Sequence, residues 1–145
     1  MDKNFFEYAP APESRALVSI KAQYGLFING AWVEPKTKDK FATINPANEE
    51  VLSKISQASD SDVDRAVKAA RAAYLKTWSK MPGKERGKYL FRIARIMQER
   101  AREFAVLETL DNGKPIRESR DVDVPLAAAH FFYHAGWADK LDHAG

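Results

Sequence analysis

Two histidines have the clearest spacing for chemistry in this sequence. His130 and His134 stand four residues apart, so in a helix they would share one face, where their ring nitrogens could ligate a metal ion. They adjoin three aromatic residues at 131–133, and His143, the nearest further ligand, lies more than two turns away. We therefore expect buried, hydrogen-bonded histidines rather than a metal site.

Asp111 is the second residue whose type and position could do chemistry. Asn112-Gly113, followed by Pro115, is a stop signal that places Asp111 at the C-terminal end of a helix. A carboxylate there opposes the negative pole of the helix dipole, which favours a compensating cation or basic side chain. Lys114 is the nearest basic side chain, and a local structural pairing is the default interpretation.

Several reactive groups are missing from the sequence. The 145 residues include no cysteine, which excludes disulfides, thiolate metal ligands and a cysteine nucleophile within them. The seven glycines form neither a GxGxxG nor a GxxxxGK[ST] phosphate loop, so no nucleotide pocket is predicted. Trp32, Trp78 and Trp137 are widely separated, and we interpret them as core aromatics rather than a ligand cage. Charges of both signs between residues 117 and 123 predict a salt-bridged helical face or a subunit contact.

The charge pattern excludes some classes of partner. The 23 basic and 20 acidic residues are interspersed and leave a net charge of +3, whereas nucleic-acid binders concentrate basic residues on one face. No apolar run is long enough for a membrane span, and residues 1–25 do not resemble a signal peptide. We expect a cytosolic protein with neither a nucleic-acid nor a membrane partner.

The first half of the chain is predicted to hold short strands after an extended arm. Residues 1–25 read as the arm, with a short turn between 14 and 21, and its aromatic residues are expected to dock on protein: Phe5, Phe6 and Tyr8. Strands are predicted over 26–33, with a hairpin turn at Asn29-Gly30, and over 41–44 and 51–55. In the last strand, Val51, Ser53 and Ile55 would share one face.

Three long helices are predicted to follow. The first has Ser61 as its cap, with acidic residues in its first turn. The second runs from about 85 to 110, and its apolar side chains form one stripe. The third spans 116–141 with Pro125 inside it, where a kink or restart is expected, and its second half is apolar on most sides. The isolated chain is thus of the α+β class.

Five segments, in order, resemble the aldehyde dehydrogenase family from about residue 25 onward. They are Phe27-Ile28-Asn29-Gly30-Ala31-Trp32-Val33, Ile44-Asn45-Pro46-Ala47, Asp62-Val63-Asp64-Arg65-Ala66-Val67-Lys68-Ala69-Ala70-Arg71, Glu108-Thr109-Leu110-Asp111-Asn112-Gly113-Lys114-Pro115 and Ala135-Gly136-Trp137-Ala138-Asp139-Lys140. Any one would be weak evidence, but together they make the resemblance specific.

The resemblance implies a larger enzyme, with a Rossmann-like cofactor domain, a catalytic domain and an oligomerisation arm. Residues 26–145 would be the incomplete N-terminal portion of the cofactor domain, and their helices would cover its sheet. In the family, a cysteine thiolate attacks an aldehyde, hydride passes to NAD or NADP, and water hydrolyses the thioester. No catalytic or cofactor-binding residue maps onto this chain, so it is expected neither to catalyse alone nor to bind the cofactor tightly.

One functional feature of the family does map onto these residues. Several members hold a monovalent cation through backbone oxygens before the Asn-Pro pair and through the aspartate of the Asp-Asn-Gly-Lys-Pro run. The corresponding positions are Thr43, Ile44 and Asp111. A cation there would offset the unfavourable position of Asp111 at a helix end.

Two hypotheses for the function follow. In the first, the chain is the N-terminal piece of an aldehyde dehydrogenase, and its partners are the remainder of that chain or, through apolar helix faces, other copies in a homo-oligomer. In the second, it is a stand-alone helical module for binding or oligomerisation that derives from the same segment. The over-apolar helix at 131–141, which has no partner within the sequence, favours the first hypothesis.

Overall fold

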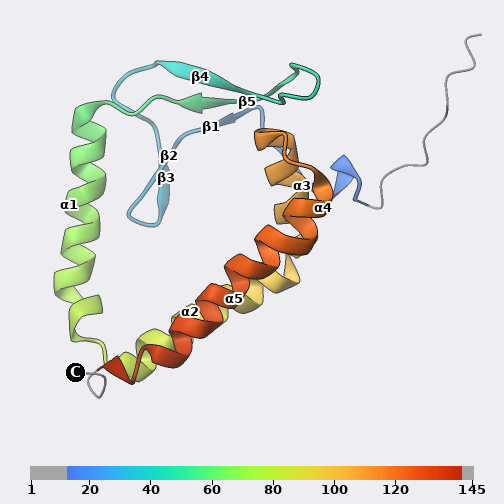
Figure 1. Ribbon diagram of the computed structural model, residues 1–145. Helices are drawn as coiled ribbons and strands as arrows, with labels where there is room; N and C mark the ends of the chain where they lie inside the picture. The colour runs from blue at the N-terminus through green and yellow to red at the C-terminus, as the bar shows by residue number, and fades with distance from the viewer. Residues whose placement is uncertain (1–12, 142–145) are drawn as a thin grey trace, which may run out of the picture.

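The computed structural model describes residues 13–141, which form short strands followed by long helices, as the sequence predicts (Figure 1). The arm residues Phe5, Phe6 and Tyr8 lie outside this range, as does His143. In chain order the elements are the 3-10 turn η1 (Arg15–Leu17), β1 (Gln23–Tyr24), β2 (Leu26–Ile28), β3 (Ala31–Val33), β4 (Lys40–Ile44), β5 (Val51–Ser56), α1 (Asp60–Lys76), the 3-10 turn η2 (Trp78–Lys80), α2 (Gly83–Glu99), α3 (Ala101–Asn112), α4 (Ile116–Glu118), the π-helical turn η3 (Ser119–Asp123) and α5 (Val124–Trp137).

The strands form two small sheets. In the first, β5 is central, parallel to β1 and antiparallel to β4. In the second, β2 and β3 form a hairpin whose turn holds Asn29 and Gly30 at φ 55° and 79°, the left-handed geometry that this pair favours. The expected alternation along β5 is wrong, because Thr43 pairs with Ser53 and Ile44 with Val51, a bulge that leaves Leu52 and Ser53 both buried.

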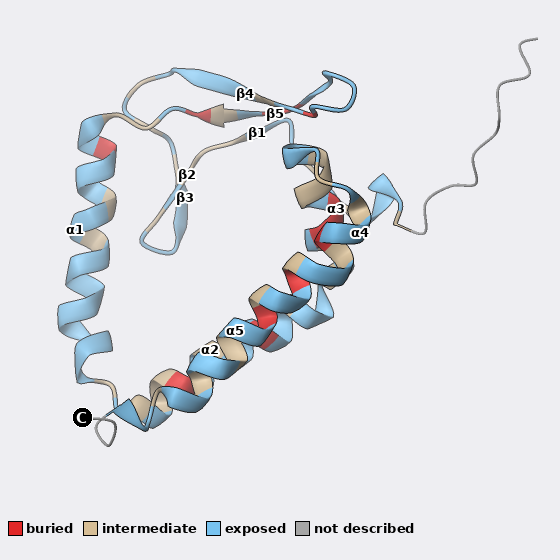
Figure 2. Ribbon diagram, in the orientation of Figure 1, coloured by how far each residue is buried: buried red, intermediate tan, exposed pale blue. Residues whose placement is uncertain are grey.

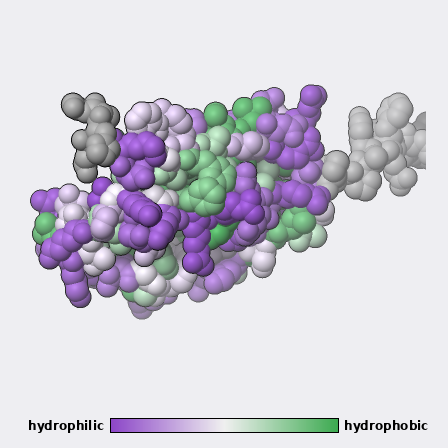
Figure 3. Space-filling view, turned by 90° about the horizontal axis from the view of Figure 1, so that it is seen from below, coloured by the Kyte–Doolittle hydropathy of each residue, from purple (hydrophilic) through white to green (hydrophobic). Residues whose placement is uncertain are grey.

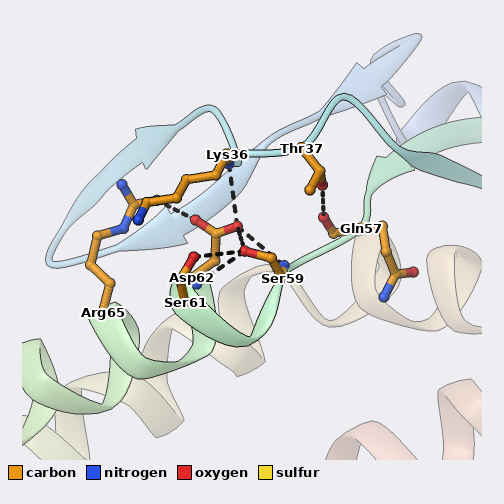
Figure 4. A network of polar contacts seen from close by, with 7 residues as sticks. All are labelled: Lys36, Thr37, Gln57, Ser59, Ser61, Asp62 and Arg65. Atoms are coloured by element: carbon orange, nitrogen blue, oxygen red, sulfur yellow. Dashed lines mark hydrogen bonds and ion pairs between the residues drawn. The ribbon is translucent and has the colours of Figure 1, made fainter.

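A buried carboxylate starts α1 (Figure 4). Asp62 is 1% exposed, and its Oδ2 accepts hydrogen bonds from the Ser59 hydroxyl at 2.7 Å and from the backbone amides of Ser59 and Lys36. The Ser59 hydroxyl in turn accepts from the Asp62 amide, which completes a capping box. The predicted cap at Ser61 is therefore wrong by two residues. The bond from Lys36 also joins α1 to the loop before β4.

The long second helix of the prediction is two helices in the structure. It breaks at Arg100, whose φ of −106° and ψ of 18° are not helical, although neither proline nor glycine marks the place. The break redirects the chain, so that Ala94 is buried on α2 while Ala105 and Val106 are buried on α3, against the π turn and α5. The single apolar stripe expected from the sequence is thus divided between two directions.

Pro125 restarts the last helix, as its position predicts. It stands in the first turn of α5, directly after the π turn. Proline has no amide hydrogen and its ring crowds the preceding turn, which a wider π turn accommodates. The amide of Val124 accordingly donates to the carbonyl of Ser119, five residues back.

The helices α2 and α5 pack side by side along most of their length (Figure 1). Glycines on α2 make this close approach possible: a methyl group on Gly87 would lie 2.9 Å from the carbonyl oxygen of Ala135, and one on Gly83 would collide with the backbone of Ala138. Backbone therefore lies nearly against backbone at this crossing, and small residues set its distance.

Most large apolar side chains in residues 13–141 remain exposed (Figure 2). Six hydrophobic residues are buried, whereas 22 large ones are exposed, among them Val63, Val67 and Tyr74 on α1. Figure 3 shows apolar residues gathered in the middle of one face with polar residues around them. Surfaces of this kind are typical of proteins that pack against a partner.

The three tryptophans are not core residues, contrary to the prediction. All three are at least 36% exposed, and each packs beside one or two neighbouring aromatic rings: Trp32 on Tyr24 and Phe27, Trp78 on Tyr89, and Trp137 on Tyr133. The core they were expected to fill does not form, because the described elements enclose little volume. No helix within residues 13–141 is long and apolar enough to cross a bilayer.

Substitution of alanine for glycine tests the crossing of α2 and α5. We expect Gly87→Ala to destabilise the chain by about 1–3 kcal/mol, because the new methyl group overpacks against backbone. Gly136→Ala on α5 is the matched control: its methyl group meets nothing within 4 Å, so helix propensity should stabilise the chain by about 1 kcal/mol. Urea unfolding followed by circular dichroism measures both, and equal effects would contradict this view of the crossing.

The buried Asp62 predicts an acid-sensitive contribution to stability. The Ser59 hydroxyl bond, with the amides of Ser59 and Lys36 and nearby Arg65, lowers the pKa of Asp62 although burial opposes this. A lowered folded pKa contributes stability above the unfolded value of about 3.9, and that stability is lost as pH falls through the folded pKa. Asp62→Asn should therefore lower the free energy of unfolding at pH 7. Below about pH 4 the difference in the free energy of unfolding between the variant and the parent should shrink. Unfolding curves across pH test this, and a constant difference would refute it.

Candidate functional site

The structure brings two of the three predicted cation-site residues into direct contact. Thr43 on β4 donates its hydroxyl to Oδ1 of Asp111 near the end of α3, although 68 positions separate them in the chain. Ile44 is the next residue of β4 and stands at the bulge, where the strand pairing shifts. Helix α3 ends at Asn112, as the stop signal predicts, with Gly113 in the left-handed conformation at φ 78°.

The two loops beside this contact also touch each other. A methyl group on Gly113 would lie 2.6 Å from Cγ of Pro46, so both its positive φ and the nearby proline require glycine there. Asn45 is buried in the same turn. Its side-chain oxygen accepts a hydrogen bond from the backbone amide of Ala47 at 3.0 Å, and its backbone amide donates to the carbonyl of Glu50 at 2.9 Å. The Asn-Pro turn is thus held by its own hydrogen bonds and packs against the end of α3.

Lys114 does not pair with Asp111, which corrects the sequence-based expectation. Its ammonium forms an ion pair with Asp123 at the end of the π turn, and this hydrogen bond raises the pKa of Lys114. The reason is geometric, since the left-handed Gly113 reverses the chain and the π turn follows within a few residues. Asp111 is therefore left with the Thr43 hydroxyl as its described side-chain partner.

The charged residues at 117–123 form the salt-bridged face that their pattern predicts. Arg120 binds Asp121 through two bonds of 2.6 and 2.8 Å, and this pairing lowers the pKa of Asp121. Ser119, by contrast, is fully buried and lies 3.4 Å from the hydroxyl of Thr109 on α3. The π turn thus contacts α3 through its first residue and the loop after α3 through its last.

The histidines do not form a site. His130 and His134 are both exposed on α5, which contradicts the expectation that they are buried. His134 packs at its ring edge against Tyr133. Within residues 13–141, no cluster of three or more histidine, aspartate or glutamate side chains is arranged to hold a metal ion.

The chemistry of the contact between β4 and α3 suits a hard cation. It offers a carboxylate and a hydroxyl, which are ligand types that alkali and alkaline-earth ions prefer. Sequence reasoning missed Asp123 and the packing of Pro46 on Gly113. The alternating charges at 117–123 pointed to ion pairs, but not to Lys114 as a partner.

Comparisons with known proteins agree with this architecture. The sequence profile of the aldehyde dehydrogenase family matches residues 32–145. The mitochondrial aldehyde dehydrogenase of Mesocricetus auratus is 41% identical over 133 residues, which are 90% of this chain and 26% of that protein. An aldehyde dehydrogenase of Alternaria alternata is 42% identical over 118 residues, or 81% of this chain and 24% of that protein. The chain thus spans about a quarter of the length of these relatives.

Solved structures share the fold. The NAD+ complex of the aldehyde dehydrogenase from Bacillus cereus has a TM-score of 0.81 and 36% identity, and the match covers 92% of this chain and 27% of that one. Both the sequence profile and the spatial arrangement of strands and helices therefore point the same way. This chain belongs to the aldehyde dehydrogenase family, of which it represents an N-terminal segment.

Proposed function

We propose that this chain serves as the N-terminal segment of an NAD(P)-dependent aldehyde dehydrogenase. In the whole protein, residues 26–145 would begin the cofactor-binding domain, and residues 1–25 would precede it as an arm. The whole protein would oxidise an aldehyde to a carboxylic acid: the nicotinamide cofactor accepts a hydride, water supplies the added oxygen, and one proton is released. The observation that carries this proposal is the match of nearly the whole chain to a quarter of each relative.

The exposed apolar surface supports the same proposal. The face of α1 with Val63, Val67 and Tyr74 is uncovered, and so are Phe91, Ile93 and Ile96 on α2. Such helix faces gain free energy when another layer of structure covers them. The remaining three-quarters of the relatives' length provides material for such a layer.

The segment would contribute structure rather than reacting groups. Its 145 residues include no cysteine, so the nucleophile of the proposed reaction must come from elsewhere in the whole protein. The sequence also lacks a glycine-rich phosphate loop, and we expect no tight binding of NAD or NADP by these residues alone.

We also propose a monovalent cation site at Thr43, Ile44 and Asp111. The contact between Thr43 and Asp111 and the pairing of Lys114 with Asp123 support it, since both leave the Asp111 carboxylate near oxygen ligands and away from a competing ammonium. A cation would neutralise a carboxylate that faces the negative end of the α3 dipole. Further ligands would come from the rest of the protein, so binding by this segment alone should be weak.

A chimera tests the proposed role in an enzyme. Residues 1–145 would replace the corresponding quarter of the Bacillus cereus enzyme, and NADH formation from NAD+ and an aldehyde would be followed at 340 nm. We expect kcat/KM within about tenfold of the parent, because the segment holds no reacting group and the exchange should change the barrier by no more than about 1.4 kcal/mol in total. The remaining three-quarters of the parent alone should be inactive. A folded but inactive chimera would favour the stand-alone module, in which these faces bind a different partner.

The same chimera tests the cation site. At equal ionic strength, sodium or potassium chloride should raise the Tm by roughly 2–4 °C over tetramethylammonium chloride, because a ligand of the folded state stabilises it. Asp111→Asn should abolish this difference, and Thr43→Val should reduce it. Asp121→Asn, which removes an exposed carboxylate outside the site, is the matched control and should keep it. An unchanged response in Asp111→Asn would rule out this location.

A further inference from the structure

Glu13, the first described residue, is a buried carboxylate that binds a distant part of the chain. Its side chain is 5% exposed. Oε2 accepts from Nη1 of Arg120 at 3.2 Å, although Arg120 lies 107 positions further along the sequence, and Oε1 lies 3.8 Å from Nε of Arg102 on α3. One carboxylate thus lies between two guanidinium groups from two different elements.

The neighbouring ion pair has a different environment. Arg15 and Glu50 lie 3.0 Å apart, but both side chains are 57% exposed. Solvent screens such a pair, and its contribution to stability is small. Removing one partner of a buried pair instead leaves an uncompensated charge, which is strongly unfavourable. Of these two attachments, Glu13 should therefore hold the segment before β1 much more firmly.

We propose that Arg102 and Arg120 form a carboxylate-binding site that straps the segment before β1 onto α3 and the π turn, with Glu13 as its ligand. Packing of the 3-10 turn Arg15–Leu17 on α3 supports this arrangement. Further along the chain, the segment is attached by the bond from the Ser53 hydroxyl to the Lys21 carbonyl and by the two-residue strand β1. Because these attachments lie at or beyond residue 21, residues 13–20 are held by Glu13, by the exposed Arg15–Glu50 pair and by the packing of Arg15–Leu17 on α3, and of the two charged anchors only Glu13 is buried.

The strap also shares an element with the contact between β4 and α3. The π turn provides Arg120 for Glu13 and Asp123 for Lys114, so it connects the start of the described chain with the loop after α3. The role of Glu13 does not depend on the proposed enzymatic function. It is a prediction about which interactions hold the N-terminal segment in place.

Hydrogen exchange of the 145-residue chain, resolved by NMR, tests the strap. The amides of Leu17 and Val18 donate to the carbonyls of Ser14 and Arg15, and they report on opening of the 3-10 turn. In Glu13→Gln their exchange should be at least about tenfold faster, because the segment loses its buried charged anchor to Arg120 and Arg102. In Glu50→Gln, the matched control with an exposed pair, exchange should stay within about twofold of the parent.

Further variants and positions separate a local strap from general destabilisation. Arg120→Met should reproduce most of the effect of Glu13→Gln, because Arg102 remains, and the double variant should exchange no faster than Glu13→Gln alone, because both changes remove the same Glu13–Arg120 interaction. The amide of Ala128, buried on α5, should exchange at the parent rate in Glu13→Gln. Parent-like exchange at Leu17 in Glu13→Gln, equal effects of Glu13→Gln and Glu50→Gln, or a matching rise at Ala128 would each overturn the proposal.

Discussion

The join between β4 and the end of α3 is a polar contact that connects the strand half of this chain with its long helices. The sheet and the long helices have few other points of contact, and at this one the Thr43 hydroxyl binds Asp111 while Pro46 packs on Gly113. Both contacts are small. The geometry of the join therefore depends on a directional hydrogen bond and on Gly113, whose left-handed backbone conformation favours glycine. The position of the sheet relative to α2 and α5 therefore depends on a few polar groups and on the conformation of the loop after α3 (Figure 1).

Small residues, rather than large ones, make the contacts that are complete within the chain. Gly83 and Gly87 bring α2 against α5, and the hydrophobic residues buried on the helices are three alanines and two valines: Ala94, Ala105, Val106, Val124 and Ala128. The large side chains face the other way, and 22 of them are exposed. This division has a physical meaning: close helix packing needs small residues, whereas a surface that will be covered by another layer carries the large ones that gain most from burial. Within residues 13–141, the chain therefore packs its helices through small residues and leaves most of its large apolar side chains exposed.

The sequence predicted the elements more accurately than their surroundings. Local signals were sufficient for the Asn29-Gly30 hairpin, the end of α3 at Asn112 and the restart at Pro125, because each depends on backbone preferences of a few residues. Burial was predicted less well: the tryptophans, His130 and His134 were expected inside and lie outside, since the sequence shows which residues are apolar or aromatic but not whether anything covers them. The site shows the same limit. Thr43 and Asp111 were placed together by resemblance to a family, whereas the pairing of Lys114 with Asp123 depends on a π turn that no local pattern announced.

Two buried carboxylates of this chain connect segments that are distant in the sequence. Asp62 accepts from the Lys36 amide and joins α1 to the loop before β4, and Glu13 joins the N-terminal segment to α3 and the π turn. Both side chains are buried and bound by donors from distant segments, and in Asp62 these bonds lower the pKa. A carboxylate held in this way is suited to positioning, and the lowered pKa makes Asp62 unsuited to general acid–base catalysis, which needs a pKa near the working pH. Asp111 differs, because it lies at the surface with one hydroxyl donor and an opposing helix dipole, and its charge is still to be compensated. That incomplete compensation is the physical reason to look for a cation at this carboxylate rather than at the two that are already satisfied.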